Sequence, residues 1–223
     1  MPKSVHVSGS SDGLREALEE RLERAGAELV EDSERAEVTI QIGAQGNSDI
    51  SIVPPSSKSP DSGIVIELSD VIIPNGGRSW ENGVMTDWIE KIIGGKKPDS
   101  EAQIRFWVNV RDVVDAITTI CLNEKENIPN GKYRMCGRRG WRMEDVTDEI
   151  RVLWQRYNNS INHSHTIESL SEVPSPVRGL HSNVGERPDL SKLHEVLISS
   201  GGDGWHPLVS MRVSLMEMIA SSK

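Results

Sequence analysis

The chain has 223 residues, which is enough for one domain, or for a larger lobe with a small appendage, that folds without disulfides. Its formal net charge of -9 argues against nucleic acid and anionic membranes as main partners, so an anionic ligand has to be held by local cationic groups. Cys121 and Cys136 form no CxxC motif, and no apolar stretch approaches the roughly 20 residues that cross a bilayer. These features predict a protein of the reducing cytoplasm with no membrane partner.

The amino-terminal residues predict a strand, a turn and a helix. Residues 5–8 form a short strand-like run, and Leu14, Leu18 and Leu22 then recur at helical spacing up to Gly26. Glycine is common just after the end of a helix because it adopts the left-handed conformation there. We therefore expect a helix that ends near Gly26.

The strands that follow are joined by short connections. Strand-like runs occupy residues 27–30, 38–42, 50–53 and 64–68. The connections between them are residues 31–37, 43–49 and 54–63. Each is shorter than the about a dozen residues that a parallel crossover with a helix needs. The sequence therefore predicts either antiparallel hairpins or a partner chain, of the same or another kind, that covers the apolar surface of the sheet.

The second half of the chain is mostly helical in pattern. Helices are expected over residues 84–93, 112–121, 146–154 and 211–219, with a strand over 131–136. Residues 157–188 are rich in Asn, Ser, His and Pro, and they predict mostly loop.

Five segments carry a family resemblance. Residues 105–116 read R-F-W-V-N-V-R-D-V-V-D-A, and the others are 71–76, 88–96, 131–137, and 189–192 with 204–207. In content and order they resemble the NAD(P)-dependent epimerase/dehydratase family, the extended short-chain dehydrogenases. The resemblance implies an α/β fold: a reduced Rossmann-like parallel sheet with missing crossover helices, plus a small α+β carboxy-terminal lobe. Residues 1–83 would form the Rossmann-like half and 84–223 the mostly helical part.

The resemblance also implies NAD(P) as a cofactor. In that family a glycine-rich turn after the first strand lets the backbone approach the pyrophosphate. Gly9 keeps the first glycine place, Asp12 and Arg15 stand in the other two, and Gly13 lies one place late. Glu31 or Asp32 stands where an acidic residue would bind the ribose hydroxyls. The cofactor-binding residues that the resemblance implies are Gly9, Ser10, Gly13, Arg15 and Asp32.

The catalytic Tyr and Lys of the family, four residues apart, are missing. The chain has two tyrosines, and Gly137 and Ile161 stand four residues after Tyr133 and Tyr157. The leading hypothesis is therefore an epimerase/dehydratase-like protein without that redox chemistry and with no catalytic residue, acting as a binding protein or a subunit. Two alternatives stay open: an active epimerase, dehydratase or reductase with Asp70, Asn109 or His181 as substitute acid/base groups, and a structural interaction protein.

The expected ligand is a nucleotide or a nucleotide sugar. The resemblance implies Asn109, Arg178 and Arg187 as the substrate-binding residues, since Arg is well suited to a diphosphate. His163 and His165 supply only two candidate metal ligands without a third at matching spacing, so no metal site is expected. With the short connections above, we expect a homo- or hetero-oligomer.

Overall fold

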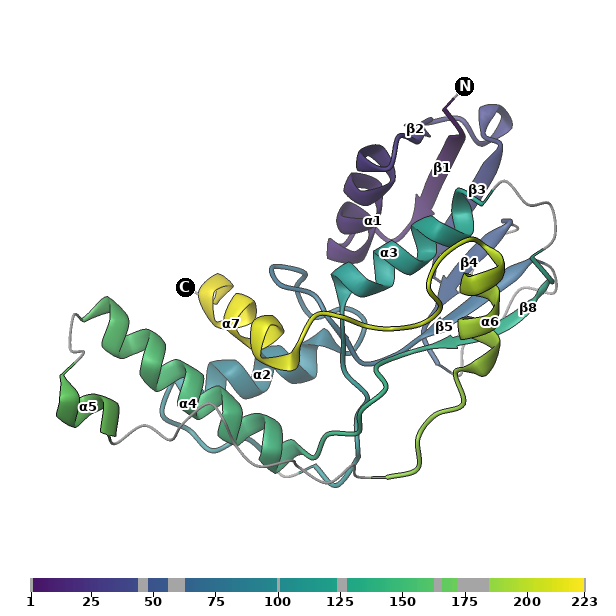
Figure 1. Cartoon of the computed structure of the whole chain (residues 1–223). Coiled ribbons are helices and arrows are strands. Elements are labelled where there is room, and N and C mark those ends of the chain that lie inside the picture. Colours follow the sequence, from purple (N-terminus) through teal and green to yellow (C-terminus); the bar gives the residue numbers. More distant parts are fainter. Residues whose placement is uncertain are drawn as a thin grey trace.

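The computed structural model describes residues 2–43, 48–55, 63–99, 101–123, 128–162, 166–171 and 185–222. Its centre is a six-stranded sheet in the order β2-β1-β3-β4-β5-β8 (Figure 1). The strands are β1 (Ser4–Gly9), β2 (Glu28–Leu29), β3 (Val38–Ile42), β4 (Ile50–Val53), β5 (Ile64–Leu68) and β8 (Gly131–Met135). All neighbouring pairs are parallel. The predicted fold class is confirmed, and the alternative of antiparallel hairpins is wrong.

One face of the sheet is covered by helices. These are α1 (Gly13–Arg24), α3 (Val110–Cys121) and α6 (Ser191–Ser199), which pack in a row across it (Figure 1). Alternate strand residues point toward this layer, and the parallel register aligns them from strand to strand. The aligned apolar residues belong to one buried cluster, which includes Val7, Ile40, Ile50, Ile52 and Ile66. Helix α1 ends as predicted, because Gly26 has φ 88 directly after its last turn.

The opposite face of the sheet carries polar side chains on several strands, with Ser51, Val53 and Val65 buried on β4 and β5. The Ser8 hydroxyl donates to the Gln41 side chain at 2.7 Å, and Lys132 pairs with Glu67 at 3.4 Å. In the described part of the chain, the helices in contact with the sheet lie on the other side. Most apolar residues of β3, β4 and β5 face those helices, and Val53 and Val65 on the opposite face are buried. The exposed apolar sheet surface expected from the sequence is therefore not found among the described residues. A partner chain stays a prediction.

The short connections account for this one-sided architecture. Between β2 and β3 the chain holds only the 3-10 turn η1 (Ser33–Arg35), and no α-helix. The missing crossover helices that were predicted are thus confirmed for this fully described connection. On the face without helices, cross-strand contacts satisfy polar side chains such as Ser8 and Glu67, while Ser51, Val53 and Val65 on the central strands are buried.

A second layer forms the predicted lobe. It contains α2 (Asn82–Ile93), α4 (Met143–Ile161) and α7 (Met211–Ser221), beside the two-stranded sheet of β6 (Val71–Ile72) and β7 (Val108–Asn109). These helices enclose their own cluster around Met85, Trp88, Ile150 and Leu215. The division into 1–83 and 84–223 stays a prediction, although β8, α3 and α6 join the first core from the later stretch.

The expected loop over residues 157–188 requires a correction. Helix α4 continues to Ile161, and α5 (Ile167–Ser171) follows. The apolar face of α4 extends beyond Leu153 because Trp154 stacks on Tyr157, with ring centroids 5.9 Å apart. The run of Asn and Ser after Tyr157 hides this continuation in the sequence.

Gly9 allows the close approach of β1 and β3. Its φ is 99, a region that residues with a side chain rarely adopt. A Cβ at this position would stand 2.0 Å from the carbonyl oxygen of Ile42. Gly26 also has a positive φ, of 88, but a Cβ there would meet nothing within 4 Å.

We predict that Gly9→Ala destabilises the fold more than Gly26→Ala does. Both substitutions add the roughly 1–2 kcal/mol penalty of a side chain at positive φ. Only Gly9→Ala adds overpacking against backbone, which costs about 1–3 kcal/mol more. Urea unfolding of the two variants measures the difference, and equal losses of stability would contradict this role of Gly9.

Candidate functional site

The strand order reverses at β1, because β2 lies on one side of it and β3 on the other. In open parallel sheets, ligands bind at the carboxyl ends of the strands at such a reversal. Gly9 and Ser10 stand at the carboxyl end of β1, and the Ser10 N–H donates to the Ile42 carbonyl at 3.1 Å. Gly13 begins α1 just beyond. The structure therefore brings Gly9, Ser10 and Gly13 together at this edge.

The N-terminus of α1 is capped by Asp12. One carboxylate oxygen accepts hydrogen bonds from the backbone N–H groups of Leu14, at 3.1 Å, and Arg15, at 3.2 Å. The other accepts from the Trp80 indole at 2.8 Å. These helix N–H groups and the positive end of the helix dipole are the features that bind phosphate in dinucleotide folds. In this chain they already hold a negative group.

A loop closes the space beside the cap. A Cβ on Gly13 would lie 2.6 Å from the Cα of Gly76 and 2.9 Å from a methyl group of Ile73. Gly13 therefore serves the close packing of this loop on the start of α1. With Asp12 and the loop in these positions, the N-terminus of α1 does not fit a dinucleotide pyrophosphate.

Arg15 and Asp32 have protein partners. The Arg15 guanidinium pairs with Glu19 at 2.7 Å along α1. The Asp32 carboxylate accepts from the Glu34 N–H at 3.0 Å and caps η1. Asp32 follows β2 at the carboxyl edge of the sheet, whereas the ion pair of Arg15 with Glu19 runs along its own helix. Their roles in cofactor binding stay predictions.

A buried arginine lies next to this edge. The guanidinium of Arg105, a residue that is 7% exposed, contacts Asp70 at 3.0 Å, Glu101 at 2.6 Å and Glu81 at 3.4 Å. Burial raises the pKa of Asp70 and the charge of Glu81 raises it further, while hydrogen bonds from the Phe106 N–H and Arg105 act in the opposite direction. The carboxylate of Asp70 is thus enclosed by protein donors, a poor position for a substitute acid or base.

Arg105 also holds a strained segment. The non-glycine residues with positive φ in the described chain are Asp70 (53), Asn75 (62), Trp80 (56) and Glu81 (65). The Glu81 carboxylate accepts from the Asp70 N–H at 2.8 Å as well as from Arg105. Such strain persists only where surrounding contacts hold it, and it often marks functional sites. The sequence did not indicate Trp80, Glu81 or Arg105 as site residues.

Asn109 connects the start of α3 to α7 through hydrogen bonds of its side chain. Its side chain accepts from the Arg111 N–H at 2.9 Å, which caps α3, and donates to the Ser214 hydroxyl of α7 at 3.0 Å. The residue is buried. Its role in substrate binding stays a prediction.

Arg187 lines a cavity of about 280 Å³ at the carboxyl end of β8. Arg138, His194 and Trp205 line it too. The His194 Nδ1 accepts the Trp205 backbone N–H at 3.0 Å, so its Nε2 carries the hydrogen when the ring is neutral. His206 has the same tautomer, since its Nδ1 lies 2.9 Å from a guanidinium nitrogen of Arg138, which only donates.

The two imidazoles are held in place by packing. The rings of His194 and His206 meet edge to face, with centroids 5.1 Å apart. Gly204 has φ 82, and a Cβ there would come within 2.3 Å of the His194 ring. The sequence indicated Arg187 but neither Arg138 nor the two histidines, because these residues come together only through the fold.

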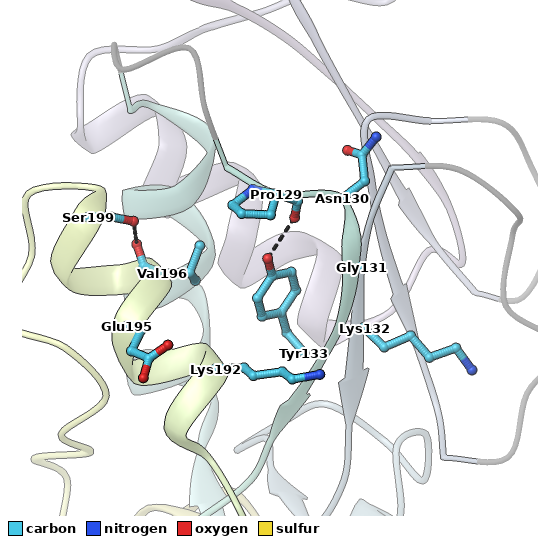
Figure 2. Close-up of a pocket in the computed structure, with 9 residues that line it drawn as sticks. All are labelled: Pro129, Asn130, Gly131, Lys132, Tyr133, Lys192, Glu195, Val196 and Ser199. Carbon is cyan, nitrogen blue, oxygen red and sulfur yellow. Dashed lines mark hydrogen bonds between the residues drawn. The ribbon is translucent and has the colours of Figure 1, made fainter.

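A larger cavity of about 450 Å³ lies between β8 and α6 (Figure 2). Figure 2 shows the Tyr133 hydroxyl directed at the Pro129 carbonyl, to which it donates at 2.6 Å, and Lys132 pointing away on the other face of β8. Burial raises the pKa of Tyr133. This cavity begins at Pro129 and Gly131, at the amino end of the strand, whereas ligands of such sheets bind at the carboxyl ends.

Several predicted residues lie outside the described part of the chain. They are Arg178, His181, His163 and His165. Among the described residues, no group of three or more His, Cys, Asp or Glu side chains is placed to hold a metal ion. The same residues contain no helix with the length and apolar character of a membrane span.

No family model and no curated protein matches the sequence. Solved structures with the same fold include WbmF from Bordetella bronchiseptica in complex with NAD+ and UDP, which is 11% identical with a TM-score of 0.57 over 99% of this chain and 92% of that one. RMD from Pseudomonas aeruginosa, complexed with NADPH, is 12% identical with a TM-score of 0.62 over 99% and 97%. UDP-glucose 4-epimerase from Thermotoga maritima, with UDP-glucose, is 13% identical with a TM-score of 0.58 over 98% of both chains. The likeness confirms the fold that the family resemblance implied.

We predict that Arg105→Met destabilises the protein by about 3–5 kcal/mol, because it leaves buried carboxylates without their cation. Arg21→Met is the matched control, because it removes an exposed ion pair with Asp115. The side chains of Arg21 and Asp115 are 38% and 58% exposed, so the loss of stability should be under about 1 kcal/mol. Denaturant unfolding measures both losses. Similar losses would contradict the central role of Arg105.

The loss from Arg105→Met should depend on pH. Burial already holds the folded-state pKa of Asp70 above its ordinary value, and loss of the neighbouring cation raises it further. A carboxyl group whose pKa is higher in the folded than in the unfolded state lowers the free energy of unfolding at pH values where it is ionised. Protonation of the group as the pH falls removes this destabilisation. The deficit relative to the unaltered protein should therefore be smaller at acidic than at neutral pH.

Proposed function

We propose that this chain is an epimerase/dehydratase-like protein that binds a nucleotide or nucleotide sugar and does not perform redox catalysis with a Tyr/Lys pair. Solved structures of the same fold carry UDP, UDP-glucose or nicotinamide dinucleotides. At this level of identity they support the ligand class only as a proposal. The support from this chain comes from the cationic cavity at Arg187.

That cavity is suited to a diphosphate. Arg138 and Arg187 supply guanidinium groups, which form charge-assisted bonds to phosphate oxygens. His194, which lines the same cavity, adds an Nε2–H donor, and His206 contacts Arg138 through its Nδ1. In a chain with a formal net charge of -9, such a concentration of cationic and donor groups favours a local anionic ligand.

Neither tyrosine supports acid/base catalysis. The Tyr133 hydroxyl is committed to the Pro129 carbonyl, and its raised pKa makes proton loss harder at neutral pH. Tyr157 stacks on Trp154 in the second layer. The two thiols are also poor nucleophiles, since burial raises the pKa of Cys121 and of Cys136 to about 11.

We also propose a binding site for NAD(P) at the carboxyl ends of β1 and β3. It would use Gly9, Ser10, Gly13, Arg15 and Asp32, and it has to compete with the Asp12 cap. We therefore expect diphosphates to bind at the Arg187 cavity more tightly than NAD(P) binds at this edge. A cytoplasmic location and an oligomeric state remain predictions.

We predict that UDP binds, and that Arg138→Ala and Arg187→Ala each weaken it about tenfold or more, because each removes a charge-assisted contact with phosphate. Arg35→Ala is the control, since its side chain is 81% exposed in η1, near β2 at the far edge of the sheet. Isothermal titration calorimetry with UDP and NAD+ measures the affinities. Binding of NAD+ that is tighter than that of UDP and unchanged in both variants would contradict the proposal.

We also predict no detectable epimerisation of UDP-sugars and no hydride transfer with added NAD(P). The absence of general acid/base help lowers a rate by about 10² to 10⁴, and loss of orientation lowers it further. Product analysis and nicotinamide absorbance report turnover. Robust turnover that depends on Asp70, Asn109 or His181 would instead support the alternative of an enzyme with substitute groups.

A further inference from the structure

We propose that the Asp12 carboxylate is an internal substitute for the dinucleotide pyrophosphate, so that NAD(P) binds this chain only when Asp12 leaves the N-terminus of α1. This inference goes beyond the proposed function, which concerns the Arg187 cavity. It starts from a disagreement: the fold is one whose solved members carry NAD+ or NADPH, while the place of the pyrophosphate holds a protein carboxylate.

The competition has two physical causes. The N–H groups of Leu14 and Arg15 donate to Asp12, so a phosphate oxygen could accept from them only after the carboxylate is displaced. A phosphate brought close to an ionised carboxylate is also repelled, and this repulsion is strong in a partly buried site. Both effects lower the affinity for NAD(P) and leave ligands elsewhere unaffected.

The cap is held by a chain of contacts that reaches the protein interior. Trp80 donates its indole N–H to Asp12, and the next residue, Glu81, accepts from Arg105 and from the Asp70 N–H. Both Trp80 and Glu81 have positive φ, with values of 56 and 65. An ordinary N-cap needs no such support from a residue 68 positions away. Trp80 and Glu81 therefore form a clamp: Glu81 is fixed by Arg105 and by the Asp70 N–H, and Trp80 holds the Asp12 carboxylate in place.

The loop on the other side of the cap completes the closure. Gly13 and Gly76 lie so close that a Cβ on Gly13 would be 2.6 Å from the Gly76 Cα. The same loop continues into the Trp80 segment. Release of Asp12 would therefore free Trp80 from one of its contacts and allow this loop to move away from α1.

The test uses Asp12→Ser, which removes the charge but keeps an oxygen that caps helices well. Asp12→Asn is the second variant, because it keeps the shape of the side chain and also caps. Trp80→Phe loosens the clamp without changing charge. Glu16→Gln is the matched control: it removes one negative charge from the first turn of α1 at an exposed position.

Calorimetry with NAD+ and amide NMR shifts of Leu14 and Arg15 give independent readouts. We expect Asp12→Ser and Asp12→Asn to raise the affinity for NAD+ about tenfold or more, with shifts at both amides, Trp80→Phe to raise it less, and Glu16→Gln to leave it unchanged. The affinity for UDP should stay the same in all four variants. If UDP does not bind the protein at all, that result contradicts the proposed function and leaves the inference about Asp12 untouched. Folded Asp12 variants that bind NAD+ no better than the unaltered protein, or not at all, would overturn the inference.

Discussion

The buried guanidinium of Arg105 is the interaction on which the arrangement of the site depends. It joins the end of β5, through Asp70, to the segment that precedes β7. It also lies over the Trp107 ring, 5.5 Å from its centroid, and Trp107 packs edge to face on Trp88 of α2. One cation thus links the sheet layer to the helical lobe. Because it fixes Glu81, it also fixes Trp80 and, through Trp80, the cap on α1.

The short connections impose a second constraint, on the sheet. Parallel strands normally carry helices on both faces. Here one face packs on α1, α3 and α6. The other carries polar side chains such as Ser8, Gln41, Glu67 and Lys132, with Ser51, Val53 and Val65 buried on the central strands. The missing crossover helices are therefore reflected in the strands, where residues that face α1, α3 and α6 alternate with residues of the other face. The carboxyl edge of the sheet, where ligands bind in this fold, is still present.

The sequence predicted local features well and long-range ones poorly. Strands β3, β4 and β5 lie within the predicted bounds, because each is a short apolar run between turn residues. Their parallel direction followed from the family resemblance and not from the strand pattern itself, because the short connections also allowed antiparallel hairpins. Strands β6 and β7 are two residues long and give no periodic signal. At the site, Gly9 and Gly13 were indicated by the family's turn, but the contact of Asp12 with Trp80 spans 68 positions and has no local pattern. The pairing of Arg138 with His206 is hidden for the same reason.

A crystal structure of the protein grown with both UDP and NAD+ tests the central claim most directly, namely that diphosphate binding belongs to the Arg187 cavity while the N-terminus of α1 is filled by Asp12. The account predicts the UDP diphosphate between Arg138 and Arg187, with the Asp12 carboxylate still on the Leu14 and Arg15 amides. A nucleotide pyrophosphate on those amides in the unaltered protein, with Asp12 displaced and the Arg187 cavity empty, would contradict it.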